Sequence, residues 1–413
     1  MMVIKTYRLW IIMLLSFVVI SCHDDDEPEI VTNDRTVLVY MIAENSLGDV
    51  VGNFAVADIM EMLHARYDIP KGSELLVYLD DLKEPRIYCI NNKTEAQTLY
   101  ELKPEYSYEE DVNSCGKENV SSILDYMVKR HPAKNYGVVF WSHGSGWIQR
   151  TNWNASMAKE HGRKTSFGID NGENHPIDKG YQMEIEDISE VFSKYGQFEF
   201  AMFDACFMQC VEVAYELRNN FKYIIASPAE IPGPGAPYDF IMSDLFASNF
   251  DASRVAKDYY EYYAYGAGDY GGALISAVET SKIGALAEAT KKALKDVVYD
   301  ESKLNGVLDY FIYDSWKKYA SFFPDFYDIK GLMQAILPQK TYNEWRSSLD
   351  DCVVGFATNY WYTQYPPGGA NIPVNHSQYS GISMFLPLNK YVDDQCAFVD
   401  KYYNTAWWKV LND

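Results

Sequence analysis

Internal repeats and low-complexity segments are absent from this chain of 413 residues, so it is neither a repeat array nor a largely disordered protein. Hydrophobic residues make up 48% of the sequence, which is enough for a sizeable core. The length allows one large domain or two smaller ones.

Positive charge is scarce relative to negative charge. Lysine and arginine total 36 against 58 aspartates and glutamates, and the formal net charge is −22. This field repels phosphate backbones, so nucleic acid is not expected as a partner. Basic peptides would be attracted, although a solvated acidic surface that aids solubility explains the same charge.

Recognisable metal motifs are also missing. The seven cysteines form no CxxC pair and no Cys/His pair with zinc-site spacing, and their spacing suggests no disulfide framework. The segment Asp170–Asp178, "DNGENHPID", lacks the glycine and glutamate of an EF-hand loop. We therefore predict no metal site and no required cofactor from the sequence pattern.

The apolar run at the N-terminus is too short for a comfortable membrane span. It reads "LWIIMLLSFVVI", follows Lys5 and Arg8, and leads to Cys22, which is typical of a signal peptide over residues 1–22. A small residue directly before Cys22 resembles a bacterial lipobox, which implies a lipid on Cys22. Cleavage of an ordinary signal peptide nearby is the alternative.

Residues 23–34 begin "HDDDEPE" and predict an acidic tether. A cysteine followed by an acidic run resembles the surface-export signal of lipoproteins in the Bacteroides group. We expect a lipoprotein of a bacterial outer membrane, displayed on the cell surface and held to the membrane by its lipid anchor.

From residue 35 to 280, apolar runs alternate with helical patterns. The expected strands are Arg35–Ala43, 74–80, 86–90, Tyr136–Ser142, 198–203, 223–227 and 272–278. The expected helices include Asp49–Tyr67 and Glu118–His131. Strands that are apolar on both faces and alternate with helices indicate a mostly parallel sheet between two helix layers, an α/β fold.

Residues 281–413 have a different pattern. Helices are expected over 281–298, 301–320 and 342–361. One strand-like run, Ser380–Pro387, returns near the end. We expect a largely helical C-terminal region that gives one strand back to the sheet or to a small subdomain.

Two predicted strands end in reactive side chains. His143 directly follows the strand Tyr136–Ser142, and Cys206 lies two residues past the strand 198–203. Parallel sheets place their ligands at the carboxyl ends of strands, so the two side chains face one another if the strands are neighbours.

This pair can perform nucleophilic catalysis. A thiol is mostly protonated at neutral pH, and an adjacent histidine can take its proton. We expect a helix to begin at Cys206, where its N-terminus would favour the thiolate. The N–H groups of Gly144 and Cys206 can form an oxyanion hole. Taken separately, however, a strand-end histidine is often a turn residue and a helix-start cysteine often belongs to the core.

Cys210 is expected to be a buried core residue. Residues 206, 210, 213, 214 and 217 would form one apolar helix stripe, with Gln209, Glu212 and Glu216 on the other side. A zinc site formed by His143, Cys206 and Cys210 is the alternative, but it lacks an evident fourth ligand.

The segments "SHGSGW" and "DACFMQCVEVAYEL", in this order, resemble the clostripain family of cysteine peptidases. "SPAEIPGPGAPYDF", "FYDIKGL" and "GISMFLP" are similar to later segments of that family, so the resemblance covers most of the chain from about residue 35. It implies a caspase-like and gingipain-like αβα sandwich. It also implies a Cys/His dyad that cuts after basic residues, self-cleavage in some members, and calcium in some members.

Asp204 has two interpretations. It can cap the following helix, or its carboxylate can lie at the base of the pocket for the substrate's P1 side chain, where Arg or Lys would supply the missing charge. The resemblance favours the P1 pocket. Glu230 is a second candidate for substrate contact, with a solvated loop glutamate as its alternative.

The segment from Trp147 to about Asp178 shows no sustained helix or strand period. Long loops in compact domains are often functional. It carries Arg150, Lys159, Arg163 and Lys164, which a protease of this specificity accepts. We expect the intact loop to obstruct the site until cleavage, preferably after Arg163 or Lys164; a harmless surface loop is the alternative.

The sequence thus predicts a lipid-anchored extracytoplasmic cysteine endopeptidase, with Cys206 as nucleophile and His143 as base. Its substrates would be proteins or peptides with Arg or Lys at P1. Two alternatives stay open: a surface lipoprotein that binds without cleaving, and a transpeptidase or acyltransferase that uses the same dyad.

Overall fold

The computed structural model describes residues 32–48, 53–148, 167–172, 180–267, 271–298, 300–311, 324–363, 370–393 and 396–413. The predicted signal peptide, Cys22 and most of the acidic tether lie outside these ranges. So do the four basic residues of the 147–178 segment. Within the described residues, no helix is both long and apolar enough to cross a membrane.

A nine-stranded sheet forms the centre of the molecule, in the order β12-β10-β9-β8-β5-β1-β2-β3-β4. Its members are β1 (Asn33–Ile42), β2 (Ser73–Asp80), β3 (Arg86–Ile90), β4 (Tyr106–Ser107), β5 (Ala133–Trp141), β8 (Phe198–Asp204), β9 (Phe221–Ala226), β10 (Leu274–Glu279) and β12 (Val353–Ala357). The five central strands β9, β8, β5, β1 and β2 are parallel. The strands at both edges are antiparallel.

The central strands are buried because helices cover both faces of the sheet. On one face, β1 and β8 contribute Val39, Phe200 and Met202, and on the other they contribute Leu38 and Phe203. Apolar side chains on alternating faces explain the continuous apolar runs in the sequence. The α/β prediction with a mostly parallel sheet is therefore confirmed.

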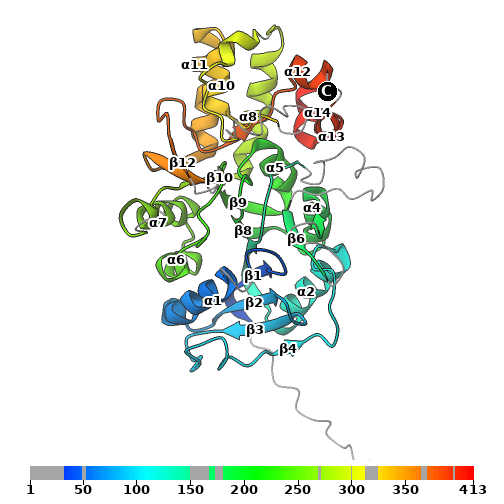
Figure 1. Cartoon of the computed structure of the whole chain (residues 1–413), viewed down its shortest axis with the longest axis vertical. Coiled ribbons are helices and arrows are strands. Elements are labelled where there is room, and N and C mark those ends of the chain that lie inside the picture. Colours follow the sequence, from blue (N-terminus) through cyan, green and yellow to red (C-terminus); the bar gives the residue numbers. More distant parts are fainter. Residues whose placement is uncertain are drawn as a thin grey trace, which may run out of the picture.

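Figure 1 shows α1, α6 and α7 on one side of the sheet and α2 and α4 on the other. The helices within residues 35–280 are α1 (Phe54–His64), η1 (Ala65–Asp68), α2 (Lys117–Arg130), α4 (Ile185–Phe192), α5 (Val211–Glu216), η2 (Leu217–Asn219), α6 (Tyr238–Leu245) and α7 (Ala252–Tyr265). Those of the C-terminal part are α8 (Thr280–Leu294), η4 (Glu301–Leu304), α10 (Ile329–Ile336), α11 (Gln339–Cys352), α12 (Asn389–Asp393), α13 (Ala397–Tyr402) and α14 (Ala406–Asn412).

Besides the main sheet, the described residues form three two-stranded ladders. They pair β11 (Tyr327–Asp328) with β15 (Ser383–Met384), β13 (Tyr360–Thr363) with β14 (Ala370–Pro373), and β6 (Phe167–Asp170) with β7 (Tyr181–Met183). The predicted strand Ser380–Pro387 thus contributes to a small ladder, which was one of the two expected outcomes. The strand β6 lies within the segment that showed no regular period.

The C-terminal part differs from its prediction in two places. The helix expected over 342–361 ends at Cys352, and the next residues form β12, which pairs antiparallel with β10 at the sheet edge. Val353 and Val354 are β-branched and fit a strand better than a helix. In the predicted helix 301–320, only the short η4 forms among the described residues.

Candidate active site

The pairing of β5 with β8 brings His143 and Cys206 to the same edge of the sheet. The two strands are parallel neighbours, and Trp141 is opposite Asp204. His143 and Cys206 each lie two residues beyond this last pair, so equal numbers of residues carry them past the sheet. Both side chains are partly exposed, whereas most of their neighbours are buried.

Glycine is required where the chain leaves β5. A Cβ atom at position 144 would lie 2.7 Å from the Cys206 carbonyl oxygen and 3.0 Å from Ala205 Cβ. Gly146 has φ +66°, and a Cβ there would lie 2.9 Å from the Phe207 carbonyl oxygen. The two glycines therefore allow the backbone after His143 to pack directly against the backbone around Cys206.

Ser46 contacts the imidazole of His143. Its Oγ lies 2.9 Å from His143 Nε2, and it follows β1, the strand next to β5. The sequence prediction found no third member for the dyad, so this contact was missed. The sequence did contain a signal for this contact: polar residues follow the end of β1, and adjacent parallel strands end at the same edge of the sheet.

Buried polar side chains hold these strand ends together. Ser142 Oγ donates to the Ile42 carbonyl oxygen (2.8 Å) and accepts from the Ile169 N–H (3.2 Å). Asn45 Nδ2 donates to the carbonyl oxygens of Ile42 and Ile169 at 2.8 and 2.7 Å. The ends of β1, β5 and β6 are therefore connected beside His143.

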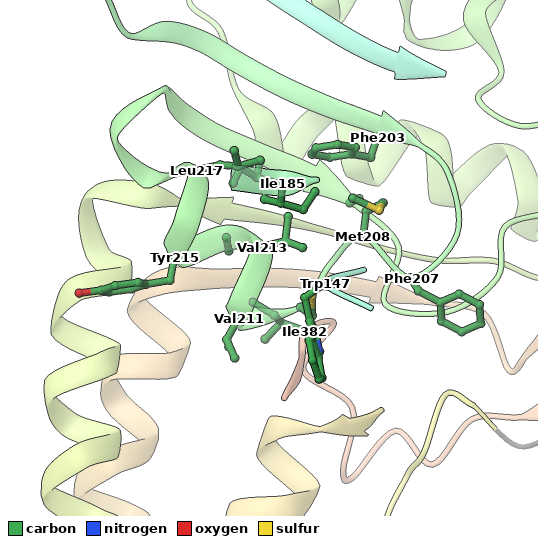
Figure 2. Packing of buried hydrophobic residues seen from close by; sticks show 14 of the residues in the cluster. Trp147, Ile185, Phe203, Phe207, Met208, Val211, Val213, Tyr215, Leu217 and Ile382 are labelled. Carbon is green, nitrogen blue, oxygen red and sulfur yellow. The ribbon is translucent and has the colours of Figure 1, made fainter. Parts of the chain in front are cut away.

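No helix begins at Cys206, which corrects the sequence prediction. Helix α5 starts at Val211, and Phe207 has φ +63°, which a helix does not allow. The chain instead runs beside the segment after β9: the Phe207 N–H donates to Ala229 and the Gln209 N–H to Ser227, at 2.9 and 3.0 Å. In Figure 2 the Phe207 side chain points away from Val211 and Val213 of the helix. The helix N-terminus therefore does not act on the Cys206 thiol as we expected.

Cys210 is fully buried, as predicted, but for a different reason. It lies at the N-cap position of α5 and not within a helical stripe that includes Cys206. Burial raises the pKa of its thiol well above the usual value. The alternative zinc site is not among the groups of possible metal ligands found in the described residues.

Two residues assigned to the polar helix side are in fact buried. Gln209 Nε2 donates to the carbonyl and hydroxyl oxygens of Ser276, both at 2.9 Å, and links the turn to β10. The Glu212 carboxylate accepts from the Phe385 N–H at 2.9 Å. Burial raises the pKa of Glu212 to about 7. Both residues connect the turn after β8 to other segments, which a helical-wheel analysis does not detect.

Asp204 is buried at the end of β8 and is not a helix cap. Its carboxylate accepts hydrogen bonds from the Ala236 N–H and from Tyr238 Oη, both at 2.9 Å. The N-cap interpretation is wrong, because α5 begins seven residues later and its N-cap position is Cys210. Asp204 instead fixes the end of the loop that joins β9 to α6.

A concentration of negative charge surrounds Asp204. Burial raises the pKa of Asp204 to about 6. Burial and, next, the charge of Asp204 raise the pKa of Asp58, whose carboxylate accepts from Trp141 Nε1 at 2.6 Å. Burial is also the main reason that the pKa of Tyr259 is raised, with additional contributions from the charges of Asp204 and Cys206. Asp204 and Cys206 are thus both within electrostatic range of one tyrosine.

Glu230 follows Ala229, whose carbonyl oxygen accepts from Phe207. Its side chain is partly buried, and Oε2 has no hydrogen-bond partner among the described residues. It is therefore not the fully solvated loop glutamate of the alternative interpretation. Arg150, Lys159, Arg163, Lys164 and Cys22 lie outside the described residues.

Two groups of side chains have metal-binding geometry in the described part of the chain. In the first, Glu44, Asp80 and Asp170 bring carboxylate oxygens within 4.8 Å of one another. The second combines Glu74, Cys89 and His131. Although burial opposes charge on His131, its hydrogen bonds to the carboxylates of Glu105 and Glu74 raise its pKa to about 9. The first group offers carboxylate oxygens alone, whereas the second combines an oxygen, a sulfur and a nitrogen donor.

A model of the clostripain family matches residues 39–413 of the chain. Clostripain of Hathewaya histolytica is 24% identical over an alignment of 243 residues that covers 51% of this chain and 42% of that protein. The alignment therefore spans less than half the length of this curated relative.

Solved structures match nearly the whole chain. One is a secreted C11 cysteine protease from Bacteroides thetaiotaomicron in complex with an irreversible peptide inhibitor. It has a TM-score of 0.73 and 30% identity, with 92% of this chain and 99% of that chain covered.

Another is an inactive zymogen C11 protease from Parabacteroides distasonis, with a TM-score of 0.73, 26% identity, and coverage of 93% of this chain and 99% of that one. The strand order that pairs His143 with Cys206 and the match over residues 39–413 agree: the chain belongs to the clostripain family of cysteine peptidases.

Proposed function

We propose that the protein is an extracytoplasmic endopeptidase that cleaves after Arg or Lys, with Cys206 as nucleophile and His143 as acid and base. The observation that carries this proposal is the register of β5 and β8, which sets the two residues at equivalent positions beyond adjacent strands. Family membership supports the reaction class.

In the proposed reaction, the Cys206 sulfur attacks the scissile carbonyl carbon and its proton passes to His143. Because Nε2 is directed at Ser46, Nδ1 is the ring nitrogen that would accept the proton. His143 then protonates the leaving amine, and water hydrolyses the acyl-enzyme. Backbone N–H groups at Gly144 and Cys206 are the proposed donors to the oxyanion.

The proposed P1 specificity is supported by the buried carboxylate of Asp204. It lies two residues before the proposed nucleophile, and its surroundings are acidic and aromatic rather than basic. Its two hydrogen bonds leave acceptor capacity on both oxygens, because each carboxylate oxygen can accept more than one bond. A guanidinium or ammonium group of the substrate would supply the missing positive charge.

Replacing the nucleophile should separate catalysis from stability. We expect Cys206→Ala to reduce hydrolysis of an Arg-containing reporter peptide by at least about a thousandfold. Cys210→Ala is the matched control: it should keep most activity and lose about 1–2 kcal/mol of unfolding free energy through lost packing. Turnover by Cys206→Ala at the wild-type rate would contradict the mechanism, and peptide ligation instead of hydrolysis would indicate a transpeptidase.

Asp204→Asn should lower kcat/KM for P1 Arg and Lys peptides by about a hundredfold or more, because it removes a buried charge partner. The free energy of unfolding should change much less than kcat/KM, since the side-chain amide oxygen of the Asn variant can still accept from the Ala236 N–H. The control is Tyr238→Phe, which removes one hydrogen bond to Asp204 and keeps its charge. Peptides that differ only in P1 Arg or citrulline provide the measurement, and an Asn variant that still prefers Arg refutes this role.

We also propose that the enzyme processes itself after Arg163 or Lys164. The segment that contains them leaves the described structure at Ile148 and returns at Phe167, which pairs with Gly144, and the Gly168 N–H donates to the His143 carbonyl oxygen at 2.9 Å. Both ends of the segment are therefore attached beside His143. A relative of this chain has been solved as an inactive zymogen, which agrees with activation by cleavage.

Wild-type protein should yield two fragments on a denaturing gel, with the new N-terminus following residue 163 or 164, while Cys206→Ala stays intact. N-terminal sequencing identifies the cut, and an Arg163→Ala, Lys164→Ala double variant tests its importance. If the wild-type protein is fully active and still a single intact chain, activation by self-cleavage is ruled out. If the Cys206→Ala protein is also cleaved, another protease does the processing.

The final part of the proposal is a lipid on Cys22, which tethers the enzyme outside the cell through the acidic residues 23–34. Metabolic labelling with a fatty-acid analogue should mark the wild type and not Cys22→Ser. Protease shaving of intact cells should release the wild-type protein if it is surface-displayed. An unlabelled wild type would identify an ordinary secreted protein.

A further inference from the structure

The group formed by Glu74, Cys89 and His131 lies at the amino edge of the main sheet, opposite the edge that carries His143 and Cys206. Glu74 is the second residue of β2, and His131 precedes β5 by two residues. Strand β3 runs antiparallel to β2, which returns Cys89 to the edge where β2 begins. One ligand atom from each of the three side chains lies within 4.8 Å of the other two. The proposed reaction uses none of them.

The His131 imidazole is held between two carboxylates. Nδ1 lies 2.8 Å from Glu74 Oε2, Nε2 lies 2.9 Å from Glu105 Oε2, and the side chain is only 9% exposed. Asn33 Nδ2 also donates to Glu74 Oε2, at 2.7 Å. The imidazole and the Glu74 carboxylate therefore have fixed orientations, as the side chains of a metal site must have.

Cys89 distinguishes this group from an ordinary network of ion pairs. Four of the six free cysteines in the described residues are buried, and only Cys89 and Cys206 are partly exposed. Burial and, next, the charges of Glu74 and Glu105 raise the pKa of the Cys89 thiol. The adjacent imidazole therefore does not activate Cys89 as a nucleophile, and a thiolate at this position requires a further positive charge.

A divalent cation can replace two protons in this group without changing its charge. With a protonated His131, a neutral Cys89 thiol and two ionised glutamates, the four side chains have a net charge of −1. With a divalent cation, a neutral imidazole, a thiolate and the same two glutamates, the net charge is again −1. The exchange therefore adds no charge to a partly buried site, where an added charge would be costly.

We propose that Glu74, Cys89 and His131 bind a zinc ion, with a water molecule as the fourth ligand. Thiolate and imidazole select Zn²⁺ over Ca²⁺ and Mg²⁺, and tetrahedral Zn²⁺ also accepts a carboxylate oxygen. His131 Nδ1, which faces Glu74, binds the ion, and the Nε2–H group keeps its hydrogen bond to Glu105. Such a carboxylate behind a zinc-bound histidine is common. The Glu74 side chain is 25% exposed, so solvent reaches the fourth position.

The ion would join the segments at the place where the chain enters the fold. Its ligands come from β2, β3 and the connection between α2 and β5. Asn33, the first residue of β1, contacts Glu74 through its side chain, and its N–H donates to the Pro132 carbonyl oxygen at 2.7 Å. The tether predicted for residues 23–34 ends here. The zinc ion therefore has a structural role, in which it stabilises the sheet edge to which the tether is attached.

The binding test uses the chelator-treated Cys206→Ala protein, so that the thiol of the proposed active site cannot bind metal. One equivalent of Co²⁺ should produce a sulfur-to-cobalt charge-transfer band in the near ultraviolet, and Zn²⁺ should abolish it. At a hundredfold excess of Zn²⁺ over Kd, Tm should rise by about 3 °C. Calorimetry at neutral pH in buffers of different ionisation enthalpy should show about two protons released for each Zn²⁺ bound.

Three variants in the same Cys206→Ala background assign the ligands. Cys89→Ala should lose the charge-transfer band and the Tm rise. Glu74→Gln should keep the band, because the thiolate remains, and weaken Zn²⁺ binding by at least about tenfold. Cys352→Ala is the matched control, since it removes a buried thiol of α11 outside the group and should keep both responses.

Two results overturn the site: a Cys206→Ala protein without the charge-transfer band, and a Cys89→Ala variant with an undiminished one. A Co²⁺ band that is accompanied by neither proton release nor a Tm rise indicates adventitious binding to a thiol, and it also overturns the site. Every readout is made on a protein that lacks the proposed nucleophile. Failure of the zinc site is therefore distinct from failure of the proposed protease activity.

Discussion

The parallel pairing of β5 with β8 is the constraint on which the candidate active site depends. It sets Trp141 opposite Asp204 and carries His143 and Cys206 past the sheet by equal distances. A shift of one residue would reverse the faces of every side chain in one strand, so the apolar cores on both faces fix this register. Core packing thus provides the free energy that positions His143 and Cys206, and the segments that carry them past the sheet need only be short.

Short connections and close backbone packing hold the rest of the site. Gly144 and Gly146 leave no room for a Cβ against residues 205–207, and Ser142 and Asn45 join the ends of β1, β5 and β6. On the opposite side, Gln209 and Asp204 connect the turn around Cys206 to β10 and to the loop before α6. Buried polar groups with satisfied hydrogen bonds specify one arrangement where apolar packing alone would allow several.

The sequence was sufficient for the sheet and for the shared edge that carries His143 and Cys206, because apolar runs and the order of strands and helices are local signals. It was insufficient for the geometry around Cys206. The helical pattern of residues 207–217 is real, but the bonds from Phe207 and Gln209 to the segment after β9 replace the first turns of that helix. Ser46 and the Glu44–Asp80–Asp170 group were missed for a related reason: their members approach only when distant strands align, and no spacing along the chain encodes that.

The central claim is that His143, positioned by this register, ionises the Cys206 thiol without help from a helix N-terminus. The most direct measurement is the pH dependence of Cys206 alkylation, followed by peptide mass mapping, in the wild type and in His143→Ala. The account predicts a midpoint below the ordinary thiol value of about 8.5 in the wild type and a rise to that value or above in the variant. The same midpoint in both proteins would contradict it.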